Sequence, residues 1–162
     1  MKPRLSVSRL LDHIYGGPGE RVPEEILLHG EMAHRQVYEA YAERCKSCEY
    51  EVPLELDRGF YVLHGRVDIV DHDNKWIVEV KTRGSVRSER ARMQLSAYVA
   101  MYRELYGPNN YYGVWLVYDW REPSRFYIVK PFWLDMTVLS VLDRAAREIL
   151  GGSSEGEEGN SC

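Results

Sequence analysis

Two acidic residues and one lysine in the middle of the sequence have types and spacings that suit catalysis. Glu79 and Lys81 are two residues apart in a strand-like run, Lys75–Lys81, so their side chains share one face. Asp68 lies in the preceding strand-like run. A hairpin that turns at Asp73–Asn74 places Asp68 directly opposite Glu79, and directly opposed residues of an antiparallel pair also share a face. The spacing therefore predicts one cluster of Asp68, Glu79 and Lys81.

Opposed carboxylates repel each other in a bare sheet, and a divalent cation held between them removes this repulsion. Magnesium and manganese prefer hard oxygen ligands and keep places for water and substrate phosphate. Lys81 adds a positive charge that can hold a phosphate oxygen, orient or deprotonate the attacking water, or offset developing charge. The cluster therefore indicates hydrolysis of a phosphodiester assisted by Mg²⁺ or Mn²⁺. The alternative is a solvated strand face on which Glu79 and Lys81 form a surface ion pair.

The helix expected over residues 88–106 carries polar groups that could serve the same cluster. Gln94 and Tyr98 are one turn apart, so an amide and a phenol can contact a nucleic-acid backbone or Lys81; an ordinary polar stripe is the alternative. Residues 81–92 hold five basic residues and one acidic residue, the kind of local charge that phosphate contacts need. From this segment we expect nucleic-acid contacts by three arginines, although a solvated charge run has the same composition: Arg83, Arg87 and Arg90.

His34 lies on the apolar stripe of a helix expected from about residue 23 to residue 44. Gly30, one turn earlier on that face, leaves room for another element to approach closely. A neutral imidazole there could be a further metal ligand, and a core histidine with satisfied hydrogen bonds is the alternative. Two acidic residues of the next strand, Glu51 and Glu55, could reach the same cleft.

The remaining pattern predicts one α/β domain with a mixed central sheet flanked by helices, over residues 1–150. Helices are expected over residues 6–14, 23–44, 88–106 and 134–150, and strands over 51–56, 60–71, 75–81, 111–118 and 125–129. Residues 151–162 hold acidic and small polar residues with almost nothing to bury, so we expect a disordered acidic tail.

Composition narrows the class of protein. The chain of 162 residues suits one domain, and its net charge of −4 excludes a basic nucleic-acid coat, so a polyanion must meet a local patch or a metal. No apolar run reaches the roughly 18 residues of a membrane helix and no signal core follows the start, so we expect a cytoplasmic protein without membrane contact. Sixteen arginines against five lysines are compatible with a thermophile. Cys45 and Cys48 have the spacing of one half of a zinc site. No second Cys pair completes it and no His pair of the right spacing follows it, so a disulfide or two inert thiols are favoured over zinc.

Four short motifs, in this order, resemble those of the PD-(D/E)XK nucleases of the RecB type, and especially of the CRISPR-associated Cas-four-like exonucleases: Gly30-x3-His34, Gly65-Arg-Val-Asp68, Glu79-Val-Lys81 and Gln94-x3-Tyr98. The resemblance covers about residues 6–118 and implies a restriction-endonuclease-like fold. It implies a metal bound by four groups: His34, Asp68, Glu79 and the backbone carbonyl of Val80. It also implies that Lys81 is the catalytic lysine and that Gln94 and Tyr98 position DNA.

One departure from that family concerns its iron–sulfur cluster, which four cysteines hold. This sequence has no cysteine before Cys45 and only Cys162 after Cys48, so we predict no cluster. The expected activity is a metal-dependent deoxyribonuclease that acts as an exonuclease on single strands or DNA ends. A DNA-binding subunit with weak catalysis and a structure-selective endonuclease are the alternatives. Partners besides DNA, whether a second copy or a helicase or recombination protein, stay open.

Overall fold

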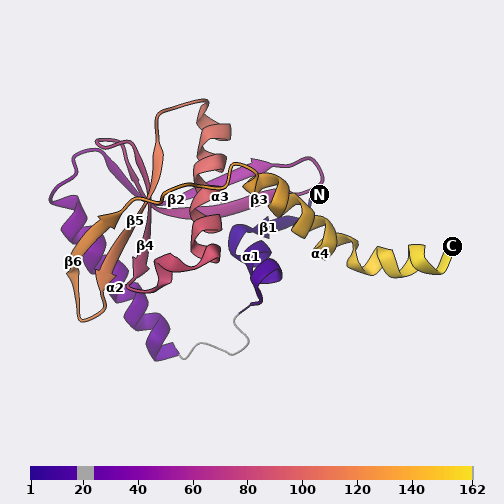
Figure 1. Cartoon of the computed structure of the whole chain (residues 1–162), viewed down its shortest axis with the longest axis horizontal. Coiled ribbons are helices and arrows are strands. Elements are labelled where there is room, and N and C mark those ends of the chain that lie inside the picture. The colour runs from indigo at the N-terminus through magenta and orange to yellow at the C-terminus, as the bar shows by residue number, and fades with distance from the viewer. Residues whose placement is uncertain (18–23, 162) are drawn as a thin grey trace.

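Figure 1 shows a computed structural model that describes residues 1–17 and 24–161, with side chains for all of these except residues 24–27 and 153–161. A mixed sheet of six strands is flanked by four α-helices. The elements in chain order are β1 (Arg4–Ser6), α1 (Val7–Tyr15), α2 (Glu24–Ala42), β2 (Cys48–Asp57), β3 (Val62–Asp71), β4 (Trp76–Thr82), the 3-10 helix η1 (Ser85–Arg87), α3 (Glu89–Tyr106), β5 (Tyr112–Asp119), β6 (Glu122–Val129) and α4 (Val138–Ser161).

The predicted fold class is confirmed, and two elements differ from the sequence pattern. Strand β1 was not predicted, because three residues are too few to show a period of two. Helix α4 continues to Ser161, whereas the pattern ends it near Leu150. The sequence predicts a disordered acidic tail over residues 151–162. The side chains of residues 153–161 and the whole of residue 162 lie outside the described part of the chain, so this prediction is not tested there. No helix in the described ranges is long and apolar enough to cross a membrane.

The central strand β3 is the place where the sheet forks. Along one edge β3 pairs with antiparallel β2 from Val62 to Asp71. Along its other edge it pairs with parallel β1 only over residues 62–64 and with antiparallel β4 only over residues 69–71. Residues 65–68 therefore have no strand partner on that edge within the described chain. Beyond β4 the sheet continues through parallel β5 to antiparallel β6.

Helices cover the sheet on two faces, and each face has its own core (Figure 1). On one face α1, α3 and α4 bury residues such as Leu10, Leu95 and Leu142 against β3, β4 and β5. On the other face α2 buries a stripe at spacings of four residues: Ala33, Val37 and Tyr41. Serine side chains begin two helices, since Ser6 accepts from the Arg9 N–H and Ser88 from the Ala91 N–H, each at 3.0 Å.

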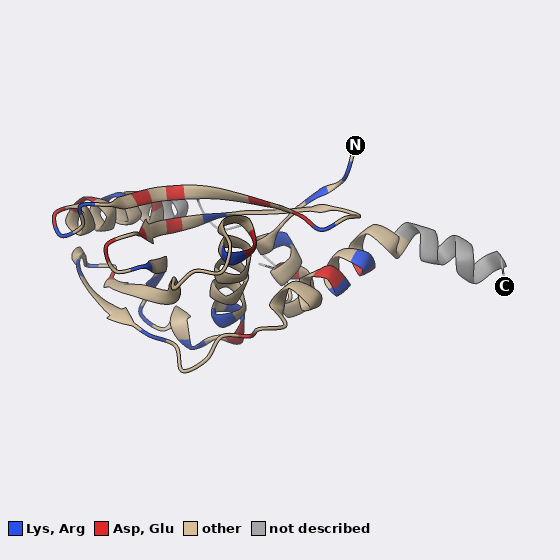
Figure 2. Cartoon of the chain, turned by 90° about the horizontal axis from the view of Figure 1, so that it is seen from above, with Lys and Arg blue, Asp and Glu red and all other residues tan. Residues whose placement is uncertain are grey.

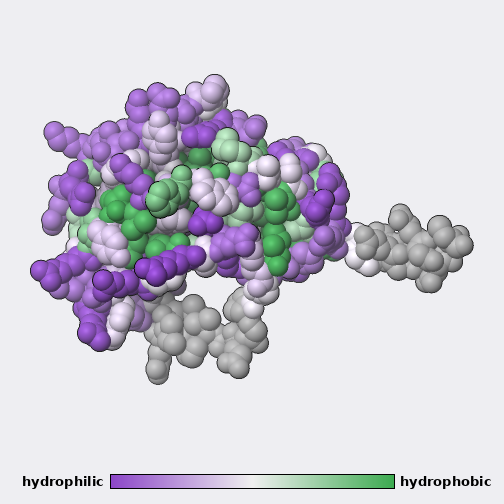
Figure 3. Space-filling view, in the orientation of Figure 1, coloured by the Kyte–Doolittle hydropathy of each residue, from purple (hydrophilic) through white to green (hydrophobic). Residues whose placement is uncertain are grey.

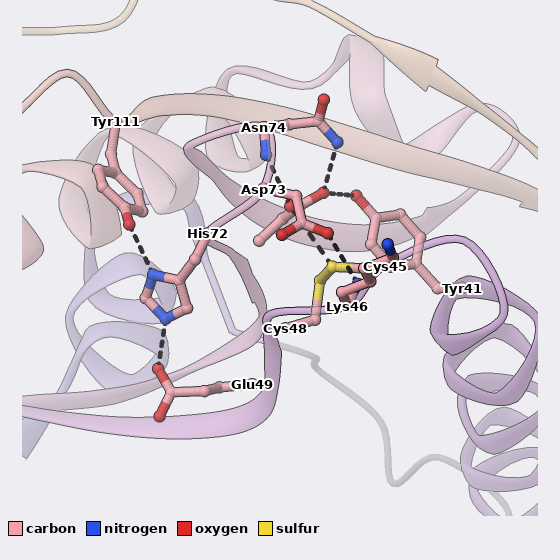
Figure 4. Close-up of a disulfide and its surroundings, with 10 residues drawn as sticks. Tyr41, Cys45, Lys46, Cys48, Glu49, His72, Asp73, Asn74 and Tyr111 are labelled. Atoms are coloured by element: carbon pink, nitrogen blue, oxygen red, sulfur yellow. Dashed lines mark hydrogen bonds and ion pairs between the residues drawn. A yellow bond between two sulfur atoms is a disulfide. The ribbon is translucent and has the colours of Figure 1, made fainter.

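A disulfide closes the loop between α2 and β2 and lies beside the β3–β4 hairpin (Figure 4). Cys45 and Cys48 are joined, which is one of the two outcomes that the sequence favoured. The Cys45 Sγ lies 3.5 Å from the carboxylate of Asp71, which is fully buried and accepts hydrogen bonds from Asn74 and from the Tyr41 hydroxyl. Burial opposes ionisation of Asp71, but these hydrogen bonds outweigh it and lower its pKa. Helix α2, which carries His34, is thereby held in place against the hairpin.

A second polar cluster ties the β2–β3 loop to α4. The Arg58 guanidinium donates to both carboxylate oxygens of Asp143, at 3.0 and 2.8 Å, and the Tyr61 hydroxyl donates at 3.0 Å. Burial works against the ionised carboxylate, but the hydrogen bonds from Arg58 and Tyr61 prevail and lower the Asp143 pKa. The cluster therefore stabilises the fold at neutral pH, and this stability is lost as the pH falls through the lowered pKa.

Replacing Asp143 by asparagine is expected to lower the free energy of unfolding at pH 7 by about 2–3 kcal/mol, because the half-buried Arg58 loses its charged partner. Urea denaturation followed by circular dichroism measures the change. The difference from wild type should shrink in acid, where the wild-type carboxylate is protonated. Asp57→Asn, which breaks an exposed pair with Lys2, is the matched control and should cost clearly less than Asp143→Asn. Equal costs for the two variants would contradict the prediction.

Candidate active site

A polar cavity of 700 Å³ lies in the fork between β1 and β4. The unpaired segment of β3 forms one wall, and the end of β4 forms the next. Helices α2 and α3 and the start of α1 complete it. Seven residues that the sequence singled out line this one cavity: His34, Asp68, Glu79, Val80, Lys81, Gln94 and Tyr98.

The side chains of Asp68 and Glu79 each accept a hydrogen bond from the backbone of the opposite strand, at the place where the β3–β4 ladder ends. Val70 pairs with Ile77, as a turn at Asp73–Asn74 requires, but the last ladder pair is Ile69 with Val78. Beyond it the strands separate and side chains replace the ladder. The Val80 N–H donates to Asp68 at 2.7 Å, and the Asp68 N–H donates to Glu79 at 3.2 Å. Each carboxylate is thus oriented by the backbone of the opposite strand.

Glu79 is a buried carboxylate of the cavity, and it lies beside a second carboxylate, that of Asp68. Its side chain is 3% exposed. Burial raises the Glu79 pKa well above its ordinary range, and the nearby Asp68 carboxylate raises it further, while Lys81 acts in the opposite direction. The two carboxylates repel each other, and the positive charge of Lys81 offsets only part of this repulsion, because the Glu79 pKa stays raised. A further positive charge would therefore stabilise the ionised pair.

Helix α3 closes the cavity with Gln94 and Tyr98. Tyr98 is 4% exposed, and its ring packs directly on the backbone of Gly65. A Cβ at residue 65 would lie 2.5 Å from the Tyr98 ring, so this position needs glycine. Burial is the main reason that the Tyr98 pKa is raised, which keeps the phenol protonated as a hydrogen-bond donor.

Helix α2 contributes His34, together with a residue that the sequence analysis missed. His34 packs edge-on against Tyr118 of β5, with ring centroids 6.1 Å apart. Tyr38, one turn after His34, donates from its hydroxyl to the Asp68 carboxylate at 3.3 Å. Spacing of four residues from His34 was the available signal for Tyr38. Tyr38, Glu51, His34 and Asp68 also line an adjoining cavity of 840 Å³; Glu55 instead pairs with Arg4.

On the prediction from sequence that Asp68 binds a metal for phosphodiester hydrolysis, replacing Tyr38 by phenylalanine should lower the cleavage rate about tenfold and raise the metal concentration needed for half-maximal rate, because Asp68 loses a group that orients it. Cleavage rates over a titration of Mg²⁺ measure both effects. Tyr50→Phe is the matched control, since the neighbouring Tyr50 hydroxyl is buried without a hydrogen-bond partner among the described residues. A Tyr38→Phe rate equal to that of the control would show that the hydroxyl does not orient Asp68.

The structure separates the three arginines that were expected to contact nucleic acid. Arg83 lines a cavity of 450 Å³ beside the β5–β6 hairpin. Arg90 forms an ion pair with Asp12 of α1 at 2.6 Å, and neither Arg90 nor the exposed Arg87 is among the residues that line the polar cavity. Figure 2 shows Lys and Arg distributed over helices, strands and loops rather than gathered on one face.

The donor set of the polar cavity fits a hard divalent cation. Two carboxylates, an imidazole and the Val80 backbone are the kinds of ligand that Mg²⁺ or Mn²⁺ accepts together with water and phosphate. The ligand atoms of His34, Asp68 and Glu79 do not all lie within 4.8 Å of one another; among the described residues, the set of three His, Cys, Asp or Glu side chains that does is Cys45, Cys48 and Asp71. Because its sulfurs form a disulfide, that set has no thiolates to offer.

Another cavity, of 440 Å³, lies between α3, the start of β5 and the loop after β6, and its walls are mainly apolar: they include Trp76, Tyr112, Leu134 and Met136. Figure 3 shows apolar side chains gathered on this face. No carboxylate lines this cavity, so it lacks the groups for metal-assisted hydrolysis.

Comparison with known proteins identifies the fold and the family of the chain. The family model of the PD-(D/E)XK nuclease superfamily matches residues 19–131. No curated protein matches the sequence. The crystal structure of SSO0001 has a TM-score of 0.58 at 20% identity, covering 93% of this chain and 76% of that one. A protein from Eubacterium rectale, provisionally described as an exonuclease, has a TM-score of 0.55 at 13% identity, covering 90% and 78% of the two chains; both likenesses show the fold. Because the family model covers most of the sequence, the chain belongs to the PD-(D/E)XK nuclease superfamily.

Proposed function

We propose that this protein is a DNA nuclease that needs Mg²⁺ or Mn²⁺ and acts as an exonuclease on single strands or DNA ends. The observation that carries the proposal is the interlocked pair of Asp68 and Glu79 beside Lys81 in one polar cavity. Burying the Glu79 carboxylate beside the Asp68 carboxylate is electrostatically unfavourable, so a role in binding a cation explains why the two lie together. The family supports nuclease activity in general, and the similar exonuclease supports the finer class.

The residues of the chain divide the work of hydrolysis. His34, Asp68, Glu79 and the Val80 carbonyl would hold the metal, which when bound supplies charge for the phosphate and acidity for a water. Lys81 is placed to hold a nonbridging phosphate oxygen or to orient the attacking water. Gln94 and the protonated Tyr98 offer hydrogen bonds that position the DNA backbone. Tyr38 keeps Asp68 oriented from the far side.

The decisive assay compares three labelled DNAs: a linear single strand, a linear duplex and a circular single strand. Each is incubated with Mg²⁺, Mn²⁺ or EDTA, and Glu79→Gln serves as the inactive control. Loss of linear DNA that spares the circle, with metal only, is the expected result. Cleavage of the circle would assign an endonuclease instead. Binding without cleavage under every condition would refute catalysis and leave a DNA-binding subunit of the same fold.

A further inference from the structure

The cavity beside the β5–β6 hairpin, called here the hairpin cavity, borders the catalytic cavity. Its volume is 450 Å³, and Tyr118 lines both. Its other walls come from segments far apart in the sequence: Arg44 just after α2, Arg83 just after β4, and four consecutive residues of β6, Ser124, Arg125, Phe126 and Tyr127. The proposed catalytic roles use none of these side chains, although the sequence predicts that Arg83 contacts nucleic acid.

Three guanidinium groups give the hairpin cavity a positive character. No carboxylate of the described chain lies within 4 Å of the guanidinium of Arg44 or Arg83; the pairs found there involve other residues. Arg125 is 81% exposed and has one loose partner, Glu122, at 3.6 Å. Asp119 also lines the cavity, but its carboxylate accepts from the Arg121 N–H at 2.9 Å within the hairpin turn. Cationic donors therefore outnumber free anionic groups.

Arg44 is held in a way that leaves its donors available. Its guanidinium carbon lies 5.3 Å from the ring centroid of Phe126 and 5.6 Å from that of Tyr41. A guanidinium stacked on rings keeps its N–H groups in the plane, where they can donate to a phosphate. The rings thus hold Arg44 in place without neutralising it.

An exposed aromatic ring lies at the edge of the hairpin cavity, in the edge strand β6, where it alternates with Phe126, the residue that faces Arg44. Tyr127 is 51% exposed although it lies in a strand. Rings beside arginines in a groove are the recurrent pattern of single-strand nucleic-acid binding, because an unpaired base offers a face for stacking and its phosphates meet the cations. A duplex offers phosphates but keeps its base faces stacked inside, so the aromatic ring would have no use there.

We infer that the hairpin cavity is a subsite that holds single-stranded nucleotides flanking the bond to be cut. Arg83 and Arg125 contact the phosphates, stacked Arg44 contacts another, and Tyr127 stacks on a base. The ligand class rests on the proposed function, since the subsite extends the same substrate path past Tyr118. The inference adds that the enzyme engages several unpaired nucleotides beyond the scissile phosphate.

Binding is measured by fluorescence anisotropy in the Glu79→Gln background, so that DNA stays intact. The probes are a labelled single strand of about 15 nucleotides, the same strand as a blunt duplex, and a tetranucleotide. The added changes are Tyr127→Ala and Arg125→Ala, both at exposed side chains, with Tyr127→Phe as the variant that keeps a ring. Arg144→Ala, at an exposed position of α4, is the matched control for lost charge.

For the long single strand, we expect Tyr127→Ala to raise Kd about tenfold, whereas Tyr127→Phe leaves it unchanged. Arg125→Ala should lower the slope of log Kd against log salt by about 0.7, the value for one phosphate contact on a single strand. The tetranucleotide and the duplex should respond little. Unchanged binding of the long strand, equal losses for all probes, or an equal loss with Arg144→Ala would overturn the inference.

Cleavage by the wild-type chain separates this inference from the proposed function. If wild type cuts DNA while the Tyr127 and Arg125 variants bind the long strand normally, the subsite is wrong and the nuclease stands. If wild type cuts nothing while the variants lose single-strand binding, the subsite stands and the catalytic proposal is wrong. Melting temperatures of the variants within about 2 °C of the parent show that the binding losses are local.

Discussion

Replacing Glu79 by glutamine is expected to abolish metal-dependent cleavage and, at the same time, to stabilise the metal-free protein. Glutamine has nearly the same shape, and its carbonyl oxygen can still accept from the Asp68 N–H. It lacks the charge that a divalent cation needs, so the cleavage rate should fall by at least about 100-fold. It also removes a carboxylate that is 3% exposed and lies beside Asp68.

The stability gain depends on pH in a direction that the pKa shift determines. Because burial and Asp68 raise the Glu79 pKa, the folded metal-free protein binds more protons than the unfolded chain between the ordinary and the raised pKa. Wild-type stability therefore falls as pH rises through that window. The Glu79→Gln variant has no such loss, so its advantage over wild type should grow as the pH rises from the ordinary glutamate pKa towards the raised one.

Thermal unfolding in EDTA across this pH range, read by circular dichroism, measures the advantage. Each 1 kcal/mol gained should raise the melting temperature by about 2–4 °C for a domain of this size. Adding Mg²⁺ should raise the melting temperature of wild type and leave that of Glu79→Gln nearly unchanged. Glu55→Gln, at an exposed position of β2, is the control and should leave cleavage intact. A variant that is both active and less stable would contradict the assigned role of Glu79.

Replacing Lys81 by methionine is expected to reduce the rate at saturating metal and DNA by about 10²–10⁴-fold. Methionine retains the length of the side chain and removes the ammonium group that faces the cavity. The loss of charge also removes the group that lowers the Glu79 pKa. Because Glu79 must be ionised to bind metal, the pH at which activity appears should move upward.

Single-turnover rates at several pH values separate the two effects of Lys81. A catalytic role predicts a rate that stays low at every pH, and the electrostatic effect predicts a shifted rise at the acid side of the profile. Lys75→Met, in the turn of the same hairpin, is the matched control and should behave like wild type. Full activity at high pH would show that Lys81 acts only by tuning Glu79.

Much of this site could be predicted from sequence because it depends on short-range geometry. The alternation of strands puts Glu79 and Lys81 on one face, and a short polar turn sets the hairpin register, which Val70 and Ile77 follow. Helical spacing likewise joins Gln94 to Tyr98. These relations act within about fifteen residues, so local periodicity contains them.

The shape of the cavity and the positions of the arginines depend on contacts between segments that are distant in sequence. The sequence gives no sign that β1 occupies only the first part of one β3 edge, although this opens the fork that holds the cavity. Nor could periodicity place Arg90 against Asp12, or bring Arg44 and Arg83 to one hairpin cavity.

The sequence by itself determined the α/β class, most of the elements, the hairpin register and the chemical types of the candidate site residues, because each follows from period and turn chemistry. Only the tertiary structure decided which polar groups meet across elements: Tyr38 with Asp68, Tyr98 over Gly65, and Tyr118 between two cavities. The physical reason is that side-chain direction at such meetings is set by sheet twist and helix packing, which depend on the whole core.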